Sequence, residues 1–528
     1  IRDRANFADG IGAAARFRNP TALAIDPTDK FLYIADRLNH RIRMMDLTTG
    51  AVTTLAGTGT DAFRDNLADA SLASFNQPSA LAVDAVGNLV ITDQFNHRIR
   101  IVSSNSALPS GGNALHLDGS NDFVEISNES NFDFTTAMTV EAWVRVSSFT
   151  KEWQTIVAKG DNSWRLSRER SGNRLEFAVS TAGGTRVVTG NLNVNDGKWH
   201  HVAATFDGTN IRLFVDGALE NTTSFGSTTI SNSNFNVSIG QNLQQTTRSW
   251  HGAIDEVRIW NQVRTEAEII QSMLGTVTGN ESGLVAAYDF NQGVADGTNT
   301  GITALTNKTS GVGLNGELKN FNLTGSTSNW VTGRTVSAWR AETLAGNGTA
   351  GLVDGAAKTS ARLNQPSGIA IGPNGTIYFS SKEEDRIRSL NNGVVSTLAG
   401  GGTAGNDGLG TASNFNDPNH LEIDKAGNLY AADANNHRIR KITPAGEVSS
   451  LVGSMTSASG NEDGIGNNAR LNTPAGLALD TLGNLYVADF GTHRIRKINL
   501  NGYEHTGNLP TGTLVNPVNG EISGKPTE

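Results

Sequence analysis

The sequence contains no cysteine, which excludes disulfides, thiol nucleophiles and thiolate metal sites. Aromatic residues make up only 6% of the chain and charged residues 18%, whereas 59 of the 528 residues are glycine. No apolar run reaches the roughly 18 residues that a membrane-spanning helix needs, so we expect no membrane insertion. This composition favours a β-rich, turn-rich protein, and the length requires more than one hydrophobic core.

The chain also lacks an excess of positive charge. It carries 42 basic and 51 acidic residues, a formal net charge of −9, which argues against nucleic acid as a partner. The sequence contains no GxSxG elbow, HExxH pair or P-loop. We therefore predict no enzyme activity and name no catalytic residue.

What is present is a repeat. The peptide NHRIR stands at 39–43, 96–100 and 436–440, with near copies THRIR at 492–496 and DRIR at 385–388. A proline precedes each copy, and these prolines are Pro20, Pro78, Pro366, Pro418 and Pro474. Each complete unit has four short apolar segments, and turns containing Gly and Asn separate several of them. Four strands in 50 to 60 residues are typical of one β-propeller blade.

These units resemble NHL repeats, a propeller family whose typical form has six blades. Five repeats are visible and cover about half of the chain, so a sixth blade is possible. In four copies an Asp stands four residues before the His, and in the third copy Ser381 and Asp385 replace both residues together. This joint change predicts that the Asp and the His are hydrogen-bond partners. A His that recurs in four of the five repeats indicates scaffolding rather than zinc binding. We expect the arginines to lie between packed blades, held by the Asp or by loop carbonyls.

The spacing of the repeats predicts an insertion. The steps between the prolines are 58, 288, 52 and 56 residues, so about 230 residues are inserted in the second repeat. That repeat lacks its fourth strand after residue 104, and TVSAWRAETLAG at 335–346 supplies a matching segment. The insert contains alternating apolar segments separated by turns, a pattern typical of an antiparallel β-sandwich.

The inserted runs LDGSNDFVEI, TVEAWVR, KWHHVAATFDGTNIRLFVDG and AIDEVRIW resemble a LamG-like, concanavalin-type jelly roll. The predicted fold is therefore all-β, an NHL-type propeller with a jelly roll inserted in blade two. The tail resembles the start of a bacterial Ig-like module. The predicted domains are 1–106 (propeller repeats one and two), 107–275 (jelly roll), 276–334 (an accessory segment packed on it), 335–501 (the rest of the propeller) and 502–528 (the Ig-like start).

Two kinds of site are candidates in the jelly roll. The resemblance implies a Ca²⁺ site at the sandwich edge, for which we name Asp118 and Asp255, since Ca²⁺ takes carboxylate and carbonyl oxygens. The alternative for these aspartates is turn capping. Trp153, Trp164 and Trp250 lie in loop-like stretches and are candidate ligand contacts, with core packing as the alternative. We interpret the adjacent His200 and His201 as part of a core strand.

The resemblance implies a secreted or cell-surface bacterial protein, a piece of a longer chain of tandem modules. We expect it to bind an extracellular glycan or protein and to contact neighbouring modules of the same chain. A passive structural spacer is the alternative, and a propeller enzyme is less favoured. The sequence alone does not name the ligand, because one fold supports many functions.

Overall fold

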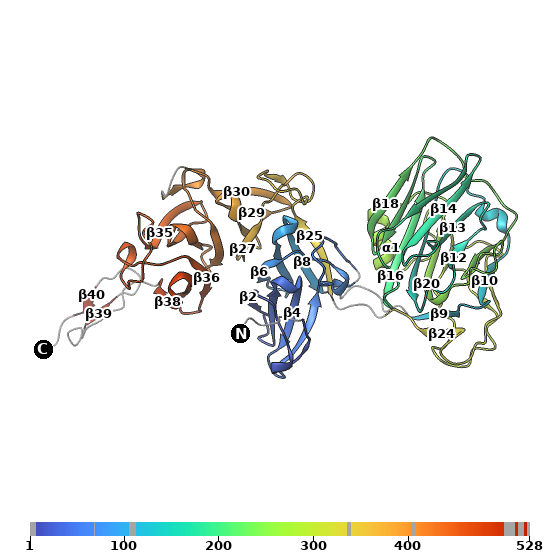
Figure 1. Cartoon of the computed structure of the whole chain (residues 1–528), viewed down its shortest axis with the longest axis horizontal. Coiled ribbons are helices and arrows are strands. Elements are labelled where there is room, and N and C mark those ends of the chain that lie inside the picture. Colours follow the sequence, from blue (N-terminus) through green and yellow to red (C-terminus); the bar gives the residue numbers. More distant parts are fainter. Residues whose placement is uncertain are drawn as a thin grey trace. The chain divides into compact units, whose positions relative to one another are not determined.

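Each proline-led repeat folds into one antiparallel sheet, and five such sheets form a β-propeller arrangement (Figure 1). The computed structural model describes residues 7–67, 69–104, 112–334, 339–402 and 407–500, with the backbone of 513–515 and 522–524. The predicted Ig-like start at 502–528 lies outside the described residues, apart from the backbone pairing of β39 (Thr513–Val515) with β40 (Ile522–Gly524). No helix in the described ranges is long and apolar enough to cross a membrane.

The blades share one strand order. Blade 1 is β1 (Gly10–Ile11), β5 (Ala51–Ala56), β4 (Arg41–Asp46), β3 (Phe31–Asp36) and β2 (Pro20–Ile25). Blade 2 is β25 (Trp339–Ala345), β8 (Arg98–Ser104), β7 (Leu89–Asp93) and β6 (Pro78–Val83). Blade 3 is β26 (Gly355–Ala356), β30 (Val394–Gly400), β29 (Arg386–Asn391), β28 (Ile377–Ser381) and β27 (Pro366–Ile371).

Blade 4 is β31 (Gly408–Leu409), β35 (Glu447–Gly453), β34 (Arg438–Ile442), β33 (Leu429–Asp433) and β32 (Pro418–Ile423). Blade 5 has three strands, β36 (Pro474–Leu479), β37 (Asn484–Asp489) and β38 (Arg494–Asn499). The proline strands lie innermost and pack on one another in the order β2, β6, β27, β32 and β36. The predicted propeller is confirmed, and each inner strand begins at the proline that marks its repeat.

The insertion in blade two is also confirmed. Strand β25 pairs with β8 from Trp339 opposite Ser104 to Ala345 opposite Ile99, so the fourth strand of blade 2 comes from beyond the insert. The chain divides into two units: the second comprises 105–338 together with Asn66–Ala68, and the first comprises the rest of both flanking parts. The insertion point is therefore the hairpin between the third and fourth strands of a blade, where added chain leaves the ladder intact.

A 3₁₀ turn joins the second and third strands of every blade and ends at the His position. The turns are η2 (Arg37–Asn39), η4 (Gln94–Asn96), η6 (Lys382–Glu384), η8 (Ala434–Asn436) and η10 (Phe490–Thr492). The residue that follows each turn has a left-handed backbone, as in His40 with φ 53°. Asp385 adopts the same conformation in blade 3 with φ 52°.

The predicted hydrogen bond between the Asp and the His of one repeat is wrong. The His Nδ1 instead accepts the backbone N–H of the residue before the next blade's proline: Gln77 donates to His40 at 3.2 Å and Thr473 donates to His437 at 3.0 Å. In blade 3 the carboxylate of Asp385 accepts the N–H of Asp417 at 2.8 Å, in the same role. This interblade latch links each blade to the next.

The blade Asp has a different set of partners. Asp36 accepts the N–H of Arg18 at 2.7 Å, the amide of Asn39 at 2.8 Å and the guanidinium of Arg43 at 2.9 Å. Arg43 is completely buried and also donates to the carbonyl of Arg16 at 3.0 Å. The prediction that these arginines are held by the Asp and by loop carbonyls is therefore confirmed. Blades 2 and 4 repeat this Arg–Asp pairing, whereas in blade 3 Ser381 replaces the aspartate and Arg388 pairs with Asp354 instead. In each case the buried guanidinium has acceptors, as its burial requires.

The insert forms two packed sheets. The β10 sheet runs β15 (Gly184–Thr189), β14 (Leu175–Thr181), β13 (Trp164–Arg168), β12 (Thr155–Ala158), β19 (Val237–Ile239), β10 (Phe123–Ile126), β23 (Gly316–Lys319) and β22 (Ala304–Leu305). The β11 sheet runs β18 (Ala218–Ser224), β17 (Asn210–Val215), β16 (Trp199–Phe206), β11 (Met138–Val146), β20 (His251–Trp260), β9 (Asn113–Asp118) and β24 (Asn329–Thr332). Strand β21 (Leu284–Tyr288) pairs with β20.

One apolar core fills the space between these sheets. Residues 276–334 supply β21, β22, β23 and β24, and they add buried side chains such as Tyr288 and Trp330 to that core. Helix α1 (Glu266–Leu274) begins with a capping box between Thr265 and Glu268. Its Ile269 packs on Ala203 and Phe214, on the outer face of the β11 sheet.

Candidate functional site

Asp255 lies in the middle of β20, opposite Trp143 of β11, and its side chain is fully buried. One carboxylate oxygen accepts the N–H of Glu256 at 2.8 Å, and the other has no hydrogen-bond partner in the part of the chain that the structure describes. Burial, with a smaller effect from Glu256, raises the pKa of Asp255 well above its ordinary value, and the charge of Arg334 opposes this. Asp255 is therefore an interior carboxyl group, shielded from solvent cations.

Asp118 does not reach Asp255. It ends β9 and pairs with His251, four residues before Asp255 on the neighbouring strand. At roughly 3.3 Å per strand residue, the two positions are about 13 Å apart along β20. A Ca²⁺ ion holds its oxygen ligands at about 2.3 to 2.6 Å. The strand register therefore does not bring Asp118 and Asp255 together as ligands of one Ca²⁺ ion, contrary to our expectation.

The loop after Asp118 already holds a cationic group. The Lys151 ammonium donates to the carbonyl of Gly119 at 2.5 Å and to the carbonyl of Ser120 at 3.4 Å. Asp122 is buried and accepts the N–H of Asp118 at 3.0 Å, and its burial raises the pKa of this carboxyl to about 6. Two carbonyl oxygens of this loop are thus engaged by a lysine. No group of three or more metal-ligating side chains lies within the described ranges.

Two of the three tryptophans expected to contact a ligand are core residues. Trp164 and Trp250 are both completely buried in the sandwich core. The Trp164 ring stacks on Phe134, with ring centroids 6.3 Å apart, and Trp250 packs edge-on to Phe149 at 5.8 Å. Their assignment as ligand contacts is therefore corrected, since neither indole reaches the surface. Strand β13 alternates, which places Trp164 inward and Arg165 outward.

Trp153 is placed differently. It lies half-buried in the loop before β12, and its φ of 50° is unusual for a bulky residue. The Arg248 guanidinium lies 4.8 Å from the ring centroid and the Arg170 guanidinium 5.5 Å from it. These distances fit cation–π contacts, which hold the indole in position.

Charged groups continue from Trp153 across the outer face of the β10 sheet. Arg248 donates to Asp161 at 2.6 Å, and Arg165 lies 3.4 Å from the same carboxylate. Arg165 also pairs with Glu176 at 3.1 Å, although burial raises the pKa of Glu176. We call Trp153, Asp161, Arg165, Glu176 and Arg248 the Trp153 cluster. An indole face beside fixed guanidinium and carboxylate groups can stack on an apolar ring face and bond to hydroxyls.

The adjacent histidines are buried and paired. Although burial alone would lower the pKa of His200, the carboxylates of Asp216 and Asp196 raise it to about 9. Its Nδ1 lies 2.9 Å from Asp216 and its Nε2 3.2 Å from Asp196. His201 points to the other face, 3.4 Å from Glu141. This arrangement agrees with a structural role in the strand.

The comparisons with known families match both parts of this architecture. Residues 118–270 match the family model described as the concanavalin A-like lectin/glucanases superfamily, Laminin_G_3. Residues 471–498 match the NHL repeat.

The chain joins an NHL-repeat propeller to a laminin G-like domain.

Relatives match the NHL propeller over short lengths. The Arabidopsis thaliana protein SUPPRESSOR OF QUENCHING 1, chloroplastic, is 34% identical over 171 residues, which are 30% of this chain and 16% of that protein. NHL repeat-containing protein 2 of Bos taurus is 36% identical over 97 residues, 18% of this chain and 13% of that protein. Human Teneurin-4 is 36% identical over 94 residues, 15% of this chain and 3% of that protein. The chain thus spans only a small part of each relative.

Solved structures show a more distant likeness. A putative carbohydrate binding protein from Bacteroides ovatus aligns at 18% identity with a TM-score of 0.33, over 53% of this chain and 75% of that one. The CBM40 of a Ruminococcus gnavus sialidase, bound to a sialyllactose, aligns at 17% identity with a TM-score of 0.27, over 32% of this chain and 100% of that one. These values describe similarity of fold only.

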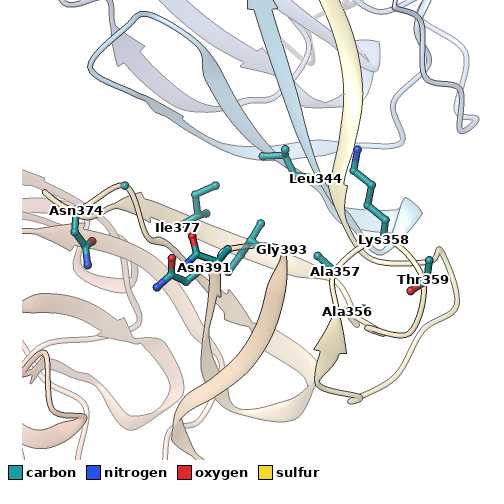
Figure 2. Close-up of a pocket in the computed structure, with 12 residues that line it drawn as sticks. Leu344, Ala356, Ala357, Lys358, Thr359, Asn374, Ile377, Asn391 and Gly393 are labelled. Atoms are coloured by element: carbon teal, nitrogen blue, oxygen red, sulfur yellow. The ribbon is translucent and has the colours of Figure 1, made fainter. Parts of the chain in front are cut away.

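The largest of three pockets described lies on the NHL propeller. Its volume is about 530 Å³, and Figure 2 shows Asn374, Ile377 and Asn391 on one side and Lys358 and Thr359 on the other. Its one ionisable lining residue, Lys358, lies 3.3 Å from Glu342. A 380 Å³ pocket in the laminin G-like domain has Glu281 as its one ionisable lining residue.

Proposed function

We propose that this protein is an extracellular binding protein whose laminin G-like domain recognises a glycan through the Trp153 cluster. The laminin G-like match and the NHL-repeat propeller support a binding or adhesion role. The matched family model, which covers lectins, supports a carbohydrate as the ligand. Location at the bacterial cell surface or in the medium belongs to the same proposal.

The observation that carries the proposal is the placement of Trp153. Its indole is only partly buried, two guanidinium groups flank it, and Asp161 holds one of them by a 2.6 Å bond. A sugar ring has apolar C–H faces and a polar rim of hydroxyls. A fixed indole can take the face, and the arginines and carboxylates can bond to the rim.

The test begins with the whole purified chain on a glycan array, followed by calorimetric titration of any glycan that binds. Trp153→Ala should weaken binding at least tenfold, which corresponds to about 1.4 kcal/mol. Trp153→Phe should weaken binding less than Trp153→Ala, because the phenyl ring keeps a face on which a sugar can stack. Val312→Ala is the matched control, since Val312 is 92% exposed and lies away from the cluster in sequence.

Two results would refute the proposal. One is the absence of glycan binding together with binding of an extracellular protein partner, which would favour protein recognition. The other is a glycan that binds Trp153→Ala as tightly as the unmodified chain. The absence of any ligand, glycan or protein, would favour the spacer role. Circular dichroism of each variant shows that a loss of binding does not come from unfolding.

A further inference from the structure

The inner strands of the NHL propeller surround a separate cavity of about 250 Å³. All five blades contribute to its lining, each through the residues at the start of its inner strand or through the first residue of its 3₁₀ turn. The cavity therefore lies where the inner strands converge. It belongs to a different domain from the Trp153 cluster, and nothing in the proposed glycan recognition uses it.

Arg37 is the unusual side chain in this lining. One guanidinium nitrogen donates to the amide oxygen of Gln94 at 3.0 Å, and its Nε is buried without a hydrogen-bond partner in the described part of the chain. The structure gives it no carboxylate partner in the described ranges. By contrast, Arg43 and Arg100 each pair with a buried aspartate within 3 Å. Burial lowers the pKa of Arg37, because removal from water destabilises the charged guanidinium. A bound anion would offset this desolvation penalty.

The rest of the lining is also suited to negative charge. Lys382 stands at the position of blade 3 that Arg37 occupies in blade 1, although it also contacts Asp417 at 3.1 Å. Gln94, Asn419 and the hydroxyl of Thr21 add neutral hydrogen-bond donors. Burial lowers the pKa of His420 to about 4, so this imidazole is neutral near pH 7. The lining contains no Asp or Glu.

This positive cavity occurs in a chain whose net charge is −9, so it does not follow from a generally basic surface. A guanidinium with free donors matches a carboxylate or a phosphate, which accept two parallel N–H bonds. We propose that the axial cavity of the NHL propeller binds a small oxyanion, a carboxylate or a phosphate, with Arg37 as its principal contact. The volume lies just below the usual range of about 300 to 1,000 Å³ for ligand pockets, which favours a compact molecule.

The experiment is isothermal titration of the whole chain at low ionic strength with two probes, inorganic phosphate and succinate. At least one probe should bind with one site per chain. Arg37→Gln should weaken that binding at least tenfold, and Lys382→Gln should weaken it less. Arg18→Gln, which removes an exposed arginine from the same blade, is the matched control and should leave the affinity unchanged.

The two probes separate the two chemistries, because binding of only one of them identifies a phosphate or a carboxylate site. Absence of binding by both probes would overturn the proposal, as would equal affinity in Arg37→Gln. If Arg37→Gln fails to fold, Arg37→Lys keeps the charge but loses the two-pronged geometry, and it should bind the anion several-fold more weakly. Unchanged affinity in Arg37→Lys and Lys382→Gln would then count against the site.

Discussion

The isoleucine of the HRIR motif offers an internal test of how burial stabilises the propeller. Five copies stand in the same strand of five blades. Ile42, Ile99, Ile387 and Ile439 are completely buried, whereas Ile495 in blade 5 is 72% exposed. Ile439 packs with Leu471 and Leu477, which belong to the segment and strand that begin blade 5. The same residue type in the same motif therefore has two environments within one chain.

Truncation to alanine should separate these environments. Ile439→Ala removes buried methyl and methylene groups and leaves a cavity, which costs about 2 to 5 kcal/mol. In a domain of this size, about 1 kcal/mol shifts the Tm by roughly 2 to 4 °C, so the expected drop is about 4 to 20 °C. Ile495→Ala removes a side chain that is already in water. Ile495→Ala should therefore lower the free energy of unfolding by less than about 0.5 kcal/mol and the Tm by less than roughly 2 °C.

The assay is differential scanning calorimetry of the whole chain. The transition of the laminin G-like domain, which these substitutions do not touch, serves as the reference. Ile42→Ala should repeat the large drop of Ile439→Ala. A drop for Ile495→Ala as large as that for Ile439→Ala would refute the reasoning, because it would mean that the free face of blade 5 is covered in solution.

Three further predictions concern the hydrogen-bonded and charged groups. His437→Ala removes the interblade latch and should lower the free energy of unfolding by about 1 kcal/mol. Asp385→His should change it by less than about 0.5 kcal/mol, because a histidine fills that position in other blades. Calorimetry that finds Asp385→His more destabilising than His437→Ala would contradict this prediction. For His200, the pKa of about 9 lies above the unfolded value of 6.5, so its stabilisation is full below pH 6.5 and disappears as the pH rises through 9. Urea unfolding of His200→Gln against the unmodified chain from pH 5.5 to 10 checks this, and a constant difference would exclude it. Finally, Ca²⁺ against EGTA should not shift the laminin G-like transition, and Asp255→Asn should be at least as stable at neutral pH, because a raised carboxyl pKa costs stability above its unfolded value of 3.8. A Ca²⁺-dependent rise in Tm that Asp255→Asn abolishes would show that the assignment of Asp255 as a shielded carboxyl is incorrect.

The sequence was sufficient for the propeller because its signals are local and repeated. A proline, a turn and an apolar triplet recur in register, so each blade could be read independently of the others. The insertion could be located because Trp339 to Ala345 repeats the fourth strand of another blade. Both inferences depend on the comparison of one segment with another, which needs no knowledge of side-chain contacts.

Contacts between distant residues were not accessible in this way. The Asp385 substitution correctly indicated that the His position forms a hydrogen bond, but the partner lies 32 residues further along, in the next blade. Asp118 and Asp255 could not be separated without the register of β9 on β20. Trp164 could have been placed correctly, because Trp164 and Leu166 alternate with Arg165 along the strand and indicate an inward indole.

The Trp153 cluster shows the same limit. Asp161 and Arg248 are 87 residues apart, and only the folded sheet brings them within 2.6 Å. Glu176 reaches Arg165 across a strand pair, which the alternation of both strands allows but does not specify. Trp153 could be proposed from its loop-like stretch of sequence, whereas the charged groups around it come together only in the fold.

The register of the insert has a consequence for the order of folding. Asn113 of β9 and Thr332 of β24 are directly paired, so the folded sandwich holds its two ends about 5 Å apart. Blade 2 must pair β8 with β25 across the whole insert. If the insert were a disordered loop, closing it would cost a large amount of conformational entropy. Once the sandwich has formed, the effective loop shrinks to the short connections on either side of it. Each halving of a loop saves about 0.6 kcal/mol, so four halvings lower the closure cost by about 2.5 kcal/mol. Because the folded sandwich holds its two ends together, the sandwich should fold first and blade 2 should be completed afterwards.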